Sequence, residues 1–345
     1  MCLSPHEREV GVGCHGRSGM GLRLSLMRVT MRDVAERAGV SVKTVSRVVN
    51  GEPHIRPETQ TQVRTAIAEL GWHPNASART LRTGRTGVIA IMVAELRRPL
   101  LAAMVEALVT EVDRHGLHAA VEPIHDDAAR LREVLASRGR TFDALLAVDA
   151  PELPEVTDDD GPVVRVDLTA VVPTLGHDRI YVDREQAADL VLRHLRLMGR
   201  SRIVRLGPGP LDFHPEAAAI PALALEGPDR RAGYRGAQRA IVDQPQVDAL
   251  VCGTDEIALG ALAGLYAAGI EVPGRIAVTG FGDLEDGRFA TPSLTTLDPD
   301  PAGMARAAVD LVRGRLRGAA DEQGHDLAVP VSLIRRESTM GASPR

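Results

Sequence analysis

The sequence TMRDVAERAGVSVKTVSRVVN at residues 30–50 decides the fold of the N-terminal part of the chain. Thr30 can cap a first helix while the side chain of Asp33 returns toward its first turn. Gly39 supplies the positive φ that ends a helix without a Cβ clash, and Ser41 starts a second helix. The interval of three or four residues between the two helices is the spacing of a helix-turn-helix. Apolar residues fall on one face of each helix: Val34, Ala35 and Ala38 on the first, Val45, Val48 and Val49 on the second.

The residues left facing outward at the start of the second helix are Val42, Lys43, Ser46 and Arg47. In a helix-turn-helix, the N-terminal residues of the second helix meet base edges in the major groove of DNA. Lysine and arginine can donate to guanine O6 and N7, and valine can touch a thymine methyl group. Lys43 is the only lysine among 41 basic residues, so the alternative is a lysine left by chance on a solvated face.

A group of small polar side chains near these positions is suited to phosphate oxygens. Its members are Ser41, Thr44, Ser46, Asn50 and Thr59. Helix capping or ordinary surface polarity explains each of them equally well, and only their grouping favours a role on DNA.

A third helix is predicted over about residues 57–70, with Pro57 in its first turn, and GWHPNASARTL follows at 71–81. The order of these parts resembles the lactose-repressor (LacI/GalR) family. The matching residues are DVA at 33–35, AGVS at 38–41, TVSRVVN at 44–50, and Pro74, Asn75, Ala78, Arg79 and Leu81. The resemblance implies a DNA-binding domain at 27–83 in which Val42, Lys43 and Arg47 read bases.

The resemblance also implies a hinge helix at 75–81. Asn75 can cap it, Ala78 keeps it thin, Arg79 is basic, and Leu81 is the apolar tip. Two such helices, one per subunit, would enter the minor groove, where the paired leucines bend the duplex. The segment is too short to form a stable isolated helix, so its order should depend on DNA and on the body of the protein. An ordinary linker is the alternative.

From Gly87 onward the chain alternates predicted strands and helices. The run VIAIMV at 88–93 is typical of a parallel strand buried on both faces. Further strands are expected at 118–121, 144–148, 163–166, 203–206, 249–252 and 276–279, and helices at 185–198, 229–242, 256–268 and 301–317. This repetition predicts a doubly wound α/β body with a ligand site at the carboxyl ends of the strands.

The family resemblance extends over this body. The matching stretches are DRRAGY at 229–234, TDEIALG at 254–260, VPGRIAVTGF at 272–281, PSLTT at 292–296 and PVSLI at 330–334. It implies a two-lobed fold like that of periplasmic binding proteins over residues 86–340, used for effector binding and dimerisation. The expected N-terminal lobe is about 86–180 and 285–317, and the expected C-terminal lobe is about 181–284 and 318–340.

Effector binding is expected in the cleft between the lobes. The candidate side chains are Arg230, Thr254, Asp255 and Asp283, and Arg97 and Arg98 end the first strand. Asp255 and Asp283 could equally be structural, as a helix cap and a strand-end turn. Two departures put an ordinary sugar effector in doubt: Thr254 stands where the family usually has Asn, and Gly282 where it usually has an acidic residue. The short interval from Tyr234 to Thr254 predicts a shortened C-terminal lobe.

The composition limits the other classes of function. Residues 1–86 carry 13 basic and 7 acidic side chains, and the rest carries 28 and 39, so a basic head sits on an acidic body. Three scattered cysteines suit a reducing cytoplasm. No membrane span, signal peptide, cofactor motif or metal site is expected, and His115, His118 and His125 fit a solvated loop best. Residues 1–26 are expected to be a mis-assigned start or a disordered arm.

The sequence therefore predicts a homodimeric transcriptional regulator, more a repressor than an activator, and not an enzyme. It would bind a near-palindromic DNA operator, with its affinity set by a small-molecule effector, a sugar or related metabolite. The short polar tail at 337–345 favours a dimer over a tetramer. A plain solute-binding protein is disfavoured by the DNA-binding head. A regulator whose shortened body only dimerises stays as the main alternative.

Overall fold

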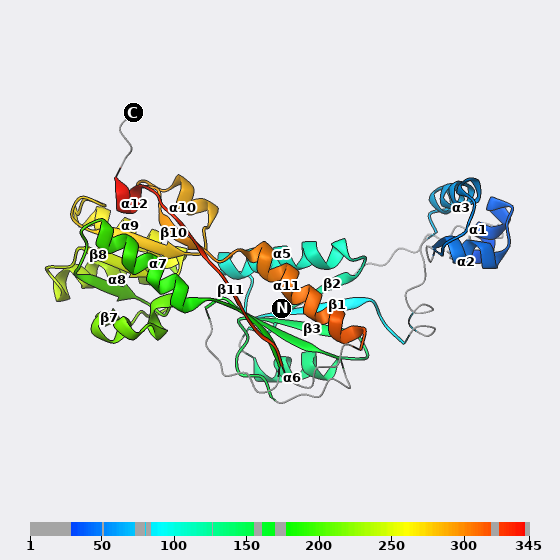
Figure 1. The fold of residues 1–345 in the computed structure, drawn as a ribbon, viewed down its shortest axis with the longest axis horizontal. Helices are drawn as coiled ribbons and strands as arrows, with labels where there is room; N and C mark the ends of the chain where they lie inside the picture. Colours follow the sequence, from blue (N-terminus) through cyan, green and yellow to red (C-terminus); the bar gives the residue numbers. More distant parts are fainter. Residues whose placement is uncertain are drawn as a thin grey trace, which may run out of the picture. The chain divides into compact units, whose positions relative to one another are not determined.

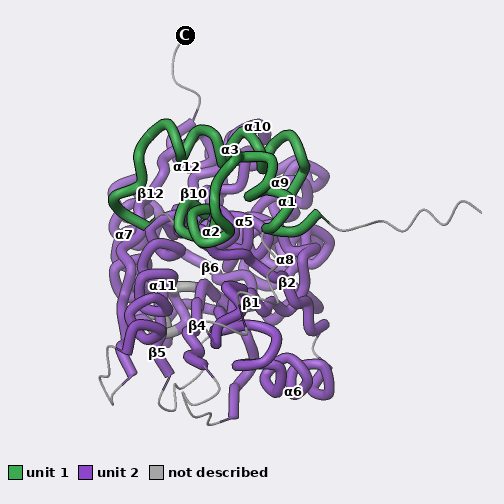
Figure 2. Tube along the Cα trace, turned by 90° about the vertical axis from the view of Figure 1, so that its right-hand side faces the viewer, with its two compact units in different colours: residues 1–76 green, residues 77–345 purple. Residues whose placement is uncertain are grey.

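The computed structural model describes residues 29–49, 52–72, 80, 84–125, 127–154, 161–169, 177–318 and 324–341. The chain divides into two compact units, residues 1–76 and 77–345, which are distinguished by colour in Figure 2. Asn50, the hinge positions Asn75, Ala78, Arg79 and Leu81, and the extension 1–26 lie outside the described residues.

The N-terminal unit is a three-helix head formed by α1 (Met31–Ala38), α2 (Val42–Val49) and α3 (Pro57–Leu70). Thr30 and Asp33 form the predicted capping box, and Gly39 ends α1 with φ of 64°. Both predictions are confirmed, as are the bounds of α3. The core of the head consists of Val34, Ala35, Val45, Val48, Val63, Ala66 and Trp72. The predicted inward faces of the first two helices therefore supply four of its buried side chains, and α3 and Trp72 supply the other three.

The C-terminal unit contains two six-stranded sheets, which define its two lobes (Figure 1). The first-lobe sheet has the order β11-β5-β4-β3-β1-β2 and is parallel throughout. Its strands are β1 (Val88–Val93), β2 (His118–Pro123), β3 (Ala144–Val148), β4 (Val163–Asp167), β5 (Asp178–Val182) and β11 (Asp326–Val329). All of β3 and β4 is buried, as expected of parallel strands covered on both faces.

The second-lobe sheet has the order β12-β10-β9-β8-β6-β7, and only β12 runs antiparallel to its neighbour. Its strands are β6 (Ile203–Leu206), β7 (Ala222–Leu223), β8 (Ala249–Cys252), β9 (Ala277–Phe281), β10 (Thr295–Asp298) and β12 (Ser332–Ile334). The two sheets thus share one strand order, with β6 in the place of β1 and β7 in the place of β2.

Helices cover both faces of each sheet. In the first lobe, α5 (Pro99–Arg114) and α11 (Pro301–Leu316) pack on one face, and α6 (Ala128–Ala136) packs on the other (Figure 1). In the second lobe, α7 (Arg184–Leu197) covers one face, and α8 (Arg230–Asp243) and α9 (Asp255–Ala267) cover the other. The shorter helices are η2 (Pro210–Phe213), η3 (Pro215–Ala219), α10 (Glu285–Phe289) and α12 (Glu337–Met340). No helix among the described residues is long and apolar enough to cross a membrane.

The chain crosses between the lobes three times, and this corrects the expected lobe boundaries. It leaves the first sheet after β5, returns after β10, and leaves again between β11 and β12. Residues 285–298, expected in the N-terminal lobe, hold α10 and β10, and β10 pairs with β9 of the second lobe. Residues 326–329, expected in the C-terminal lobe, pair with β5 of the first.

The C-terminal lobe is shortened at a different place from the one expected. Most of α8 and the whole of β8 fit between Tyr234 and Thr254, and the second lobe has as many strands as the first. The short connection lies elsewhere, between β6 and β7, where η2 and η3 stand in place of a long helix.

Candidate functional site

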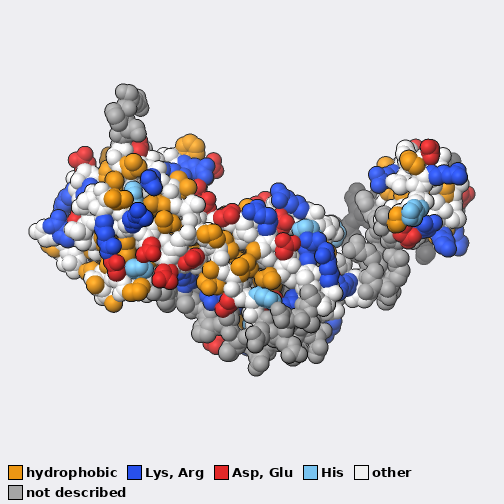
Figure 3. Space-filling model, in the orientation of Figure 1, with side chains coloured by type: hydrophobic (Ala, Val, Ile, Leu, Met, Phe, Trp, Pro, Cys, Tyr) orange, Lys and Arg blue, Asp and Glu red, His pale blue; other side chains and the backbone are white. Residues whose placement is uncertain are grey.

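The first candidate surface is the outer face of α2 in the head. Val45 and Val48 anchor this helix in the core, which leaves Val42 and Lys43 exposed at its N-terminal end. Val42 is 44% exposed, so part of its apolar side chain is accessible to a partner. Figure 3 shows basic side chains at several places around the visible face of this unit. The predicted base-reading end of α2 is therefore open to a partner.

Arg47 lies on the same helix and is already engaged. Its Nε donates to Glu52 Oε2 at 2.9 Å, and its side chain is 42% exposed. An exposed ion pair of this kind contributes only about 0–1 kcal/mol. The remaining guanidinium donors of Arg47 can therefore turn to a base or a phosphate at small cost.

The predicted phosphate ligands at the start of α2 also cap the helix. Ser41 Oγ accepts from the backbone amide of Thr44 at 3.1 Å and lies 2.9 Å from Thr44 Oγ1. Ser46 and Thr59 are half-buried. Capping thus accounts for the position of Ser41, and a hydroxyl that caps can still donate to a phosphate oxygen.

The second candidate site is a cavity of about 320 Å³ between the lobes. Glu95, Arg97, Arg98, Pro99 and Leu100 line it from the first lobe, and Pro228, Asp229, Thr254, Glu256 and Leu284 line it from the second. These residues follow the carboxyl ends of β1, β8 and β9 or precede α8. This is the place where doubly wound sheets bind ligands.

Arg98 is the most available charged group in this inter-lobe cavity. It is half-buried at the N-cap of α5, and no ion pair or hydrogen bond joins its side chain to another described residue. Arg97 beside it is 88% exposed and pairs with Glu95 at 2.5 Å. A half-buried guanidinium without a partner favours an anionic or hydroxyl-bearing ligand group.

Two of the four predicted effector residues lie at or beside the inter-lobe cavity. Thr254 lines it, and its Oγ1 caps α9 by accepting from Ile257 N at 3.4 Å. Arg230 does not line the cavity, because its guanidinium turns to Glu256, 2.9 Å from Nε, and to Asp286. Arg230 therefore helps to fix the position of Glu256, which lines the cavity.

Asp255 and Asp283 do not line the inter-lobe cavity. Asp255 is fully buried, and its carboxylate accepts from Thr296 Oγ1 at 2.6 Å and from Leu284 N at 2.8 Å. Burial raises the pKa of Asp255 to about 6. Asp283 is held by Arg336 at 2.5 Å and Arg288 at 2.7 Å. These contacts favour the structural alternative for both aspartates.

Several lining residues were not predicted as ligands, namely Glu95, Pro99, Leu100, Pro228, Asp229, Glu256 and Leu284. The sequence signal that most of them share is their position after the end of a buried strand. The strand-end rule could have found Glu95 after β1 and Glu256 after β8. It could not have found Pro228, because that residue reaches the cavity from the loop before α8.

Comparison with known proteins decides the family. Residues 30–75 match the model of the bacterial regulatory proteins of the lacI family, and residues 174–339 match the periplasmic binding protein-like domain. The chain is 28% identical to the transcriptional regulator GalS of Salmonella typhimurium, over 90% of this chain and 96% of that protein. The chain belongs to the lacI family. It is a DNA-binding transcriptional regulator and not an enzyme.

Other relatives agree with this lacI-family assignment. The lactose operon repressor of Escherichia coli is 28% identical, over 92% of this chain and 94% of that protein. A crystal structure of the Lac repressor dimer, bound to operator and the anti-inducer ONPF, matches with a TM-score of 0.72 and 26% identity. That match covers 90% of this chain and 99% of the Lac repressor chain. The predicted helix-turn-helix head and two-lobed body are confirmed by this fold.

Proposed function

We propose that this lacI-family regulator is a repressor that binds a near-palindromic operator as a homodimer and responds to a small molecule in the inter-lobe cavity. The observation that supports the effector most directly is the lining of that cavity from both lobes. Its volume of about 320 Å³ lies in the range of small-molecule sites. A ligand that contacts both lobes binds one lobe arrangement more tightly than another, and so shifts the population toward it.

On the head, we propose that Val42, Lys43 and Arg47 read bases, with Ser41, Thr44, Ser46, Asn50 and Thr59 at phosphates. The hinge residues Asn75, Ala78, Arg79 and Leu81 are proposed to contact the minor groove. The exposure of Val42 and Lys43 on α2 supports the first set. The hinge would connect the lobe arrangement to DNA affinity.

The polar groups of the lining favour an effector with hydroxyl groups or one small anionic group, such as a sugar derivative, a nucleoside or a small acid. Arg98, whose side chain has no partner among the described residues, offers donors, and the carboxylates of Glu95, Asp229 and Glu256 offer acceptors. Among the described residues, the lining contains no aromatic side chain on which a sugar ring could stack. The lack of such a side chain favours a second candidate function, in which the body of the protein only dimerises and binds no effector.

Thermal melting of the full chain against sugars, nucleosides and small acids tests this proposal. A specific rise of several degrees would identify the effector class, since a ligand that binds only the folded state stabilises it. The rise should be lost in Arg98→Ala and kept in Arg114→Ala, which removes an exposed arginine of α5 that does not line the cavity. The stabilising compound should also change the affinity for DNA. If no compound shifts the melting temperature, the dimerisation-only body is favoured instead.

A further inference from the structure

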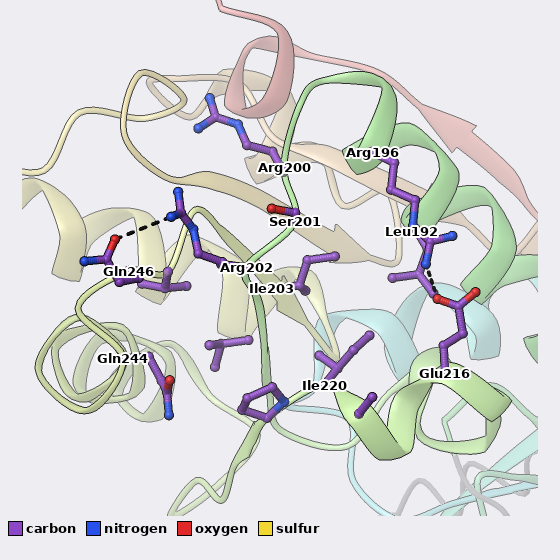
Figure 4. Close-up of a pocket in the computed structure, with 14 residues that line it drawn as sticks. Leu192, Arg196, Arg200, Ser201, Arg202, Ile203, Glu216, Ile220, Gln244 and Gln246 are labelled. Carbon is purple, nitrogen blue, oxygen red and sulfur yellow. Dashed lines mark hydrogen bonds and ion pairs between the residues drawn. The ribbon is translucent and has the colours of Figure 1, made fainter.

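The second lobe has another cavity, larger than the inter-lobe cavity, which the proposed function does not use. It has a volume of about 480 Å³ and lies at the amino ends of β6, β7 and β8 (Figure 4). Leu192 and Arg196 of α7, Ile203 of β6, and Ile220 and Val247 from the segments before β7 and β8 are among its lining residues. We call it the amino-end pocket.

We propose that the amino-end pocket binds a small organic anion with an apolar body, such as an aryl or alkyl carboxylate or sulfonate. The occupant is a second class of ligand, separate from the effector of the inter-lobe cavity. The two cavities share no lining residue and lie at opposite ends of the parallel strands.

The pocket exists because one helix of the repeated lobe pattern is missing. In the first lobe, the connection from β1 to β2 is α5, and its buried Leu101, Met104 and Leu108 cover the sheet beside α11. In the second lobe, the connection from β6 to β7 is η2 and η3, and α7 is left as the long helix on that face. The space that a full helix would fill beside α7 stays open.

The floor of the pocket is apolar. Leu192, Ile203, Ile220 and Val247 contribute aliphatic side chains, and Figure 4 shows Ile203 and Ile220 near its centre. Because these groups offer no hydrogen bonds, a small inorganic ion would gain little from the floor. A ligand with an alkyl or aryl body would bury apolar surface there, at about 25 cal/mol per Å².

The rim is basic. Arg196 and Arg202 lie on opposite sides of Ile203 and Ile220 in Figure 4, and Arg200 also lines the pocket. Glu216 is the one acidic residue among the described residues of the lining, and it pairs with Arg196. Arg202 donates to Asp248 Oδ2 at 3.3 Å and to Gln246 Oε1 at 3.4 Å, both long contacts. Arg200 donates to the backbone carbonyls of Pro273 and Arg275, so Arg196 and Arg202 are the groups left to meet a ligand. With Asp248 counted beside Glu216, three guanidinium groups stand against two carboxylates, and the remaining positive charge favours an anionic head group.

The exposed ion pairs on the rim do not compete strongly with such a ligand. Arg196 and Glu216 are 55% and 47% exposed, so their pair is weak. Guanidinium groups bind carboxylate and sulfonate oxygens through two parallel hydrogen bonds, a geometry that neither long contact of Arg202 provides. The volume also lies within the range of small-molecule sites.

Fluorescence titration of the full chain with 8-anilinonaphthalene-1-sulfonate, an aromatic anion, tests the proposal. Saturable binding with one site per chain is expected. Octanoate should displace the probe, and octanol at the same concentration should displace it at least tenfold less well. Equal displacement by the neutral alcohol would overturn the selection for an anion.

Variants locate the site. The double variant Arg196→Ala with Arg202→Ala should weaken probe binding at least tenfold. Arg193→Ala removes an exposed arginine from the same helix that does not line the pocket, and should leave binding unchanged. Ile220→Ser should also weaken probe binding. This variant leaves the charge of the pocket unchanged and so tests the contribution of the apolar floor. Circular dichroism melting checks that each variant is folded.

Two results would contradict the assignment. Unchanged probe affinity in the double variant would exclude the amino-end pocket. Loss of probe binding in Arg98→Ala, with the pocket variants unaffected, would place the anion in the inter-lobe cavity instead. Neither result would count against the proposed repressor function, which is tested by melting with effectors and by DNA binding.

Discussion

Arg47, which we propose reads bases, also pairs with Glu52 beyond the end of α2. Its bond to Glu52 at 2.9 Å orients the side chain along the exposed face of α2. The sequence was sufficient to place Arg47 on this face, because the valine spacing of α2 fixes which side is buried. The pairing with Glu52 could not be foreseen, since it depends on how the chain turns after α2.

Replacing Arg47 by alanine should relax sequence specificity and cost roughly 1–3 kcal/mol of binding free energy, as for a bidentate base contact. Fluorescence anisotropy with cognate and scrambled duplexes measures both effects. Arg37→Ala on α1, which breaks an exposed pair with Glu69, is the matched control and should change specificity little. Equal losses on both duplexes would make Arg47 a phosphate contact.

Asp255 shows why a titratable residue in a family motif need not bind ligand. A carboxylate at this place was equally compatible with a cleft ligand and with a structural role. The deciding contacts come from Thr296 and Leu284, which are distant in the sequence. The contact of Asp283 with Arg336 likewise favours a structural role for Asp283. The sequence does not show that these two residues pair.

The raised pKa of Asp255 makes its contribution to stability depend on pH. The folded state holds the proton up to about pH 6, while the unfolded chain releases it near 3.9. The stability gained from this proton is therefore present below about pH 4 and is lost as the pH rises through 6.

Asp255→Asn lacks this proton equilibrium. Relative to wild type, the variant should gain about 1 kcal/mol of unfolding free energy as the pH rises from 5 to 8. Urea denaturation at the two pH values measures the change. Asp310→Asn replaces an exposed carboxylate on α11 and serves as the control. A difference between Asp255→Asn and wild type that stays constant with pH would refute the ionisation argument.

At the scale of elements, α8 and α9 pack through glycines. A Cβ at Gly260 would lie 1.9 Å from the carbonyl oxygen of Arg230, and one at Gly233 would lie 2.0 Å from that of Ile257. No side chain fits between backbones this close, so the two helices approach each other only because these positions are glycine.

Gly260→Ala should lower the unfolding free energy by about 1–3 kcal/mol, because the helices must separate to admit a methyl group. Gly314→Ala in α11 is the matched control, since a Cβ there meets no atom within 4 Å. It should stabilise the protein by about 0.5–1 kcal/mol through helix propensity. Thermal melting compares the two, and wild-type stability for Gly260→Ala would contradict the packing account.

The hinge proposal belongs to the same scale. Leu81→Ser should abolish DNA bending, because serine cannot wedge between base pairs, while the circular dichroism spectrum stays that of wild type. Fluorescence energy transfer across a doubly labelled duplex measures the bend. Unchanged bending would rule out the leucine wedge.

The longer elements were predictable from sequence, and several short strands were not. The apolar runs of β1, β3 and β8 stand out, and their bounds agree with prediction. By contrast, β10 is TTLD, a polar string whose Thr295 and Thr296 are completely buried. Their hydroxyls bond to Thr339 and Asp255. Hydrogen-bond partners from distant segments allow these polar side chains to be buried, and no local sequence pattern predicts such partners.

At the scale of the molecule, two lobes with one strand order are connected by three crossings. The α/β class and the two-lobed body followed from the alternation of strands and helices and from the family resemblance. The lobe boundaries could not be predicted in this way, because β10 and β11 each join the sheet of the other lobe from the one expected. Which sheet a strand joins depends on its pairing partner and not on its order in the chain.

The central claim is that two copies of the head read one operator. Selection of bound duplexes from a randomised DNA library, using the full chain, tests it most directly. We expect enrichment of a near-palindromic sequence made of two inverted half-sites, because a two-fold dimer presents its α2 helices symmetrically. Enrichment of a single asymmetric half-site, or of no sequence at all, would contradict it.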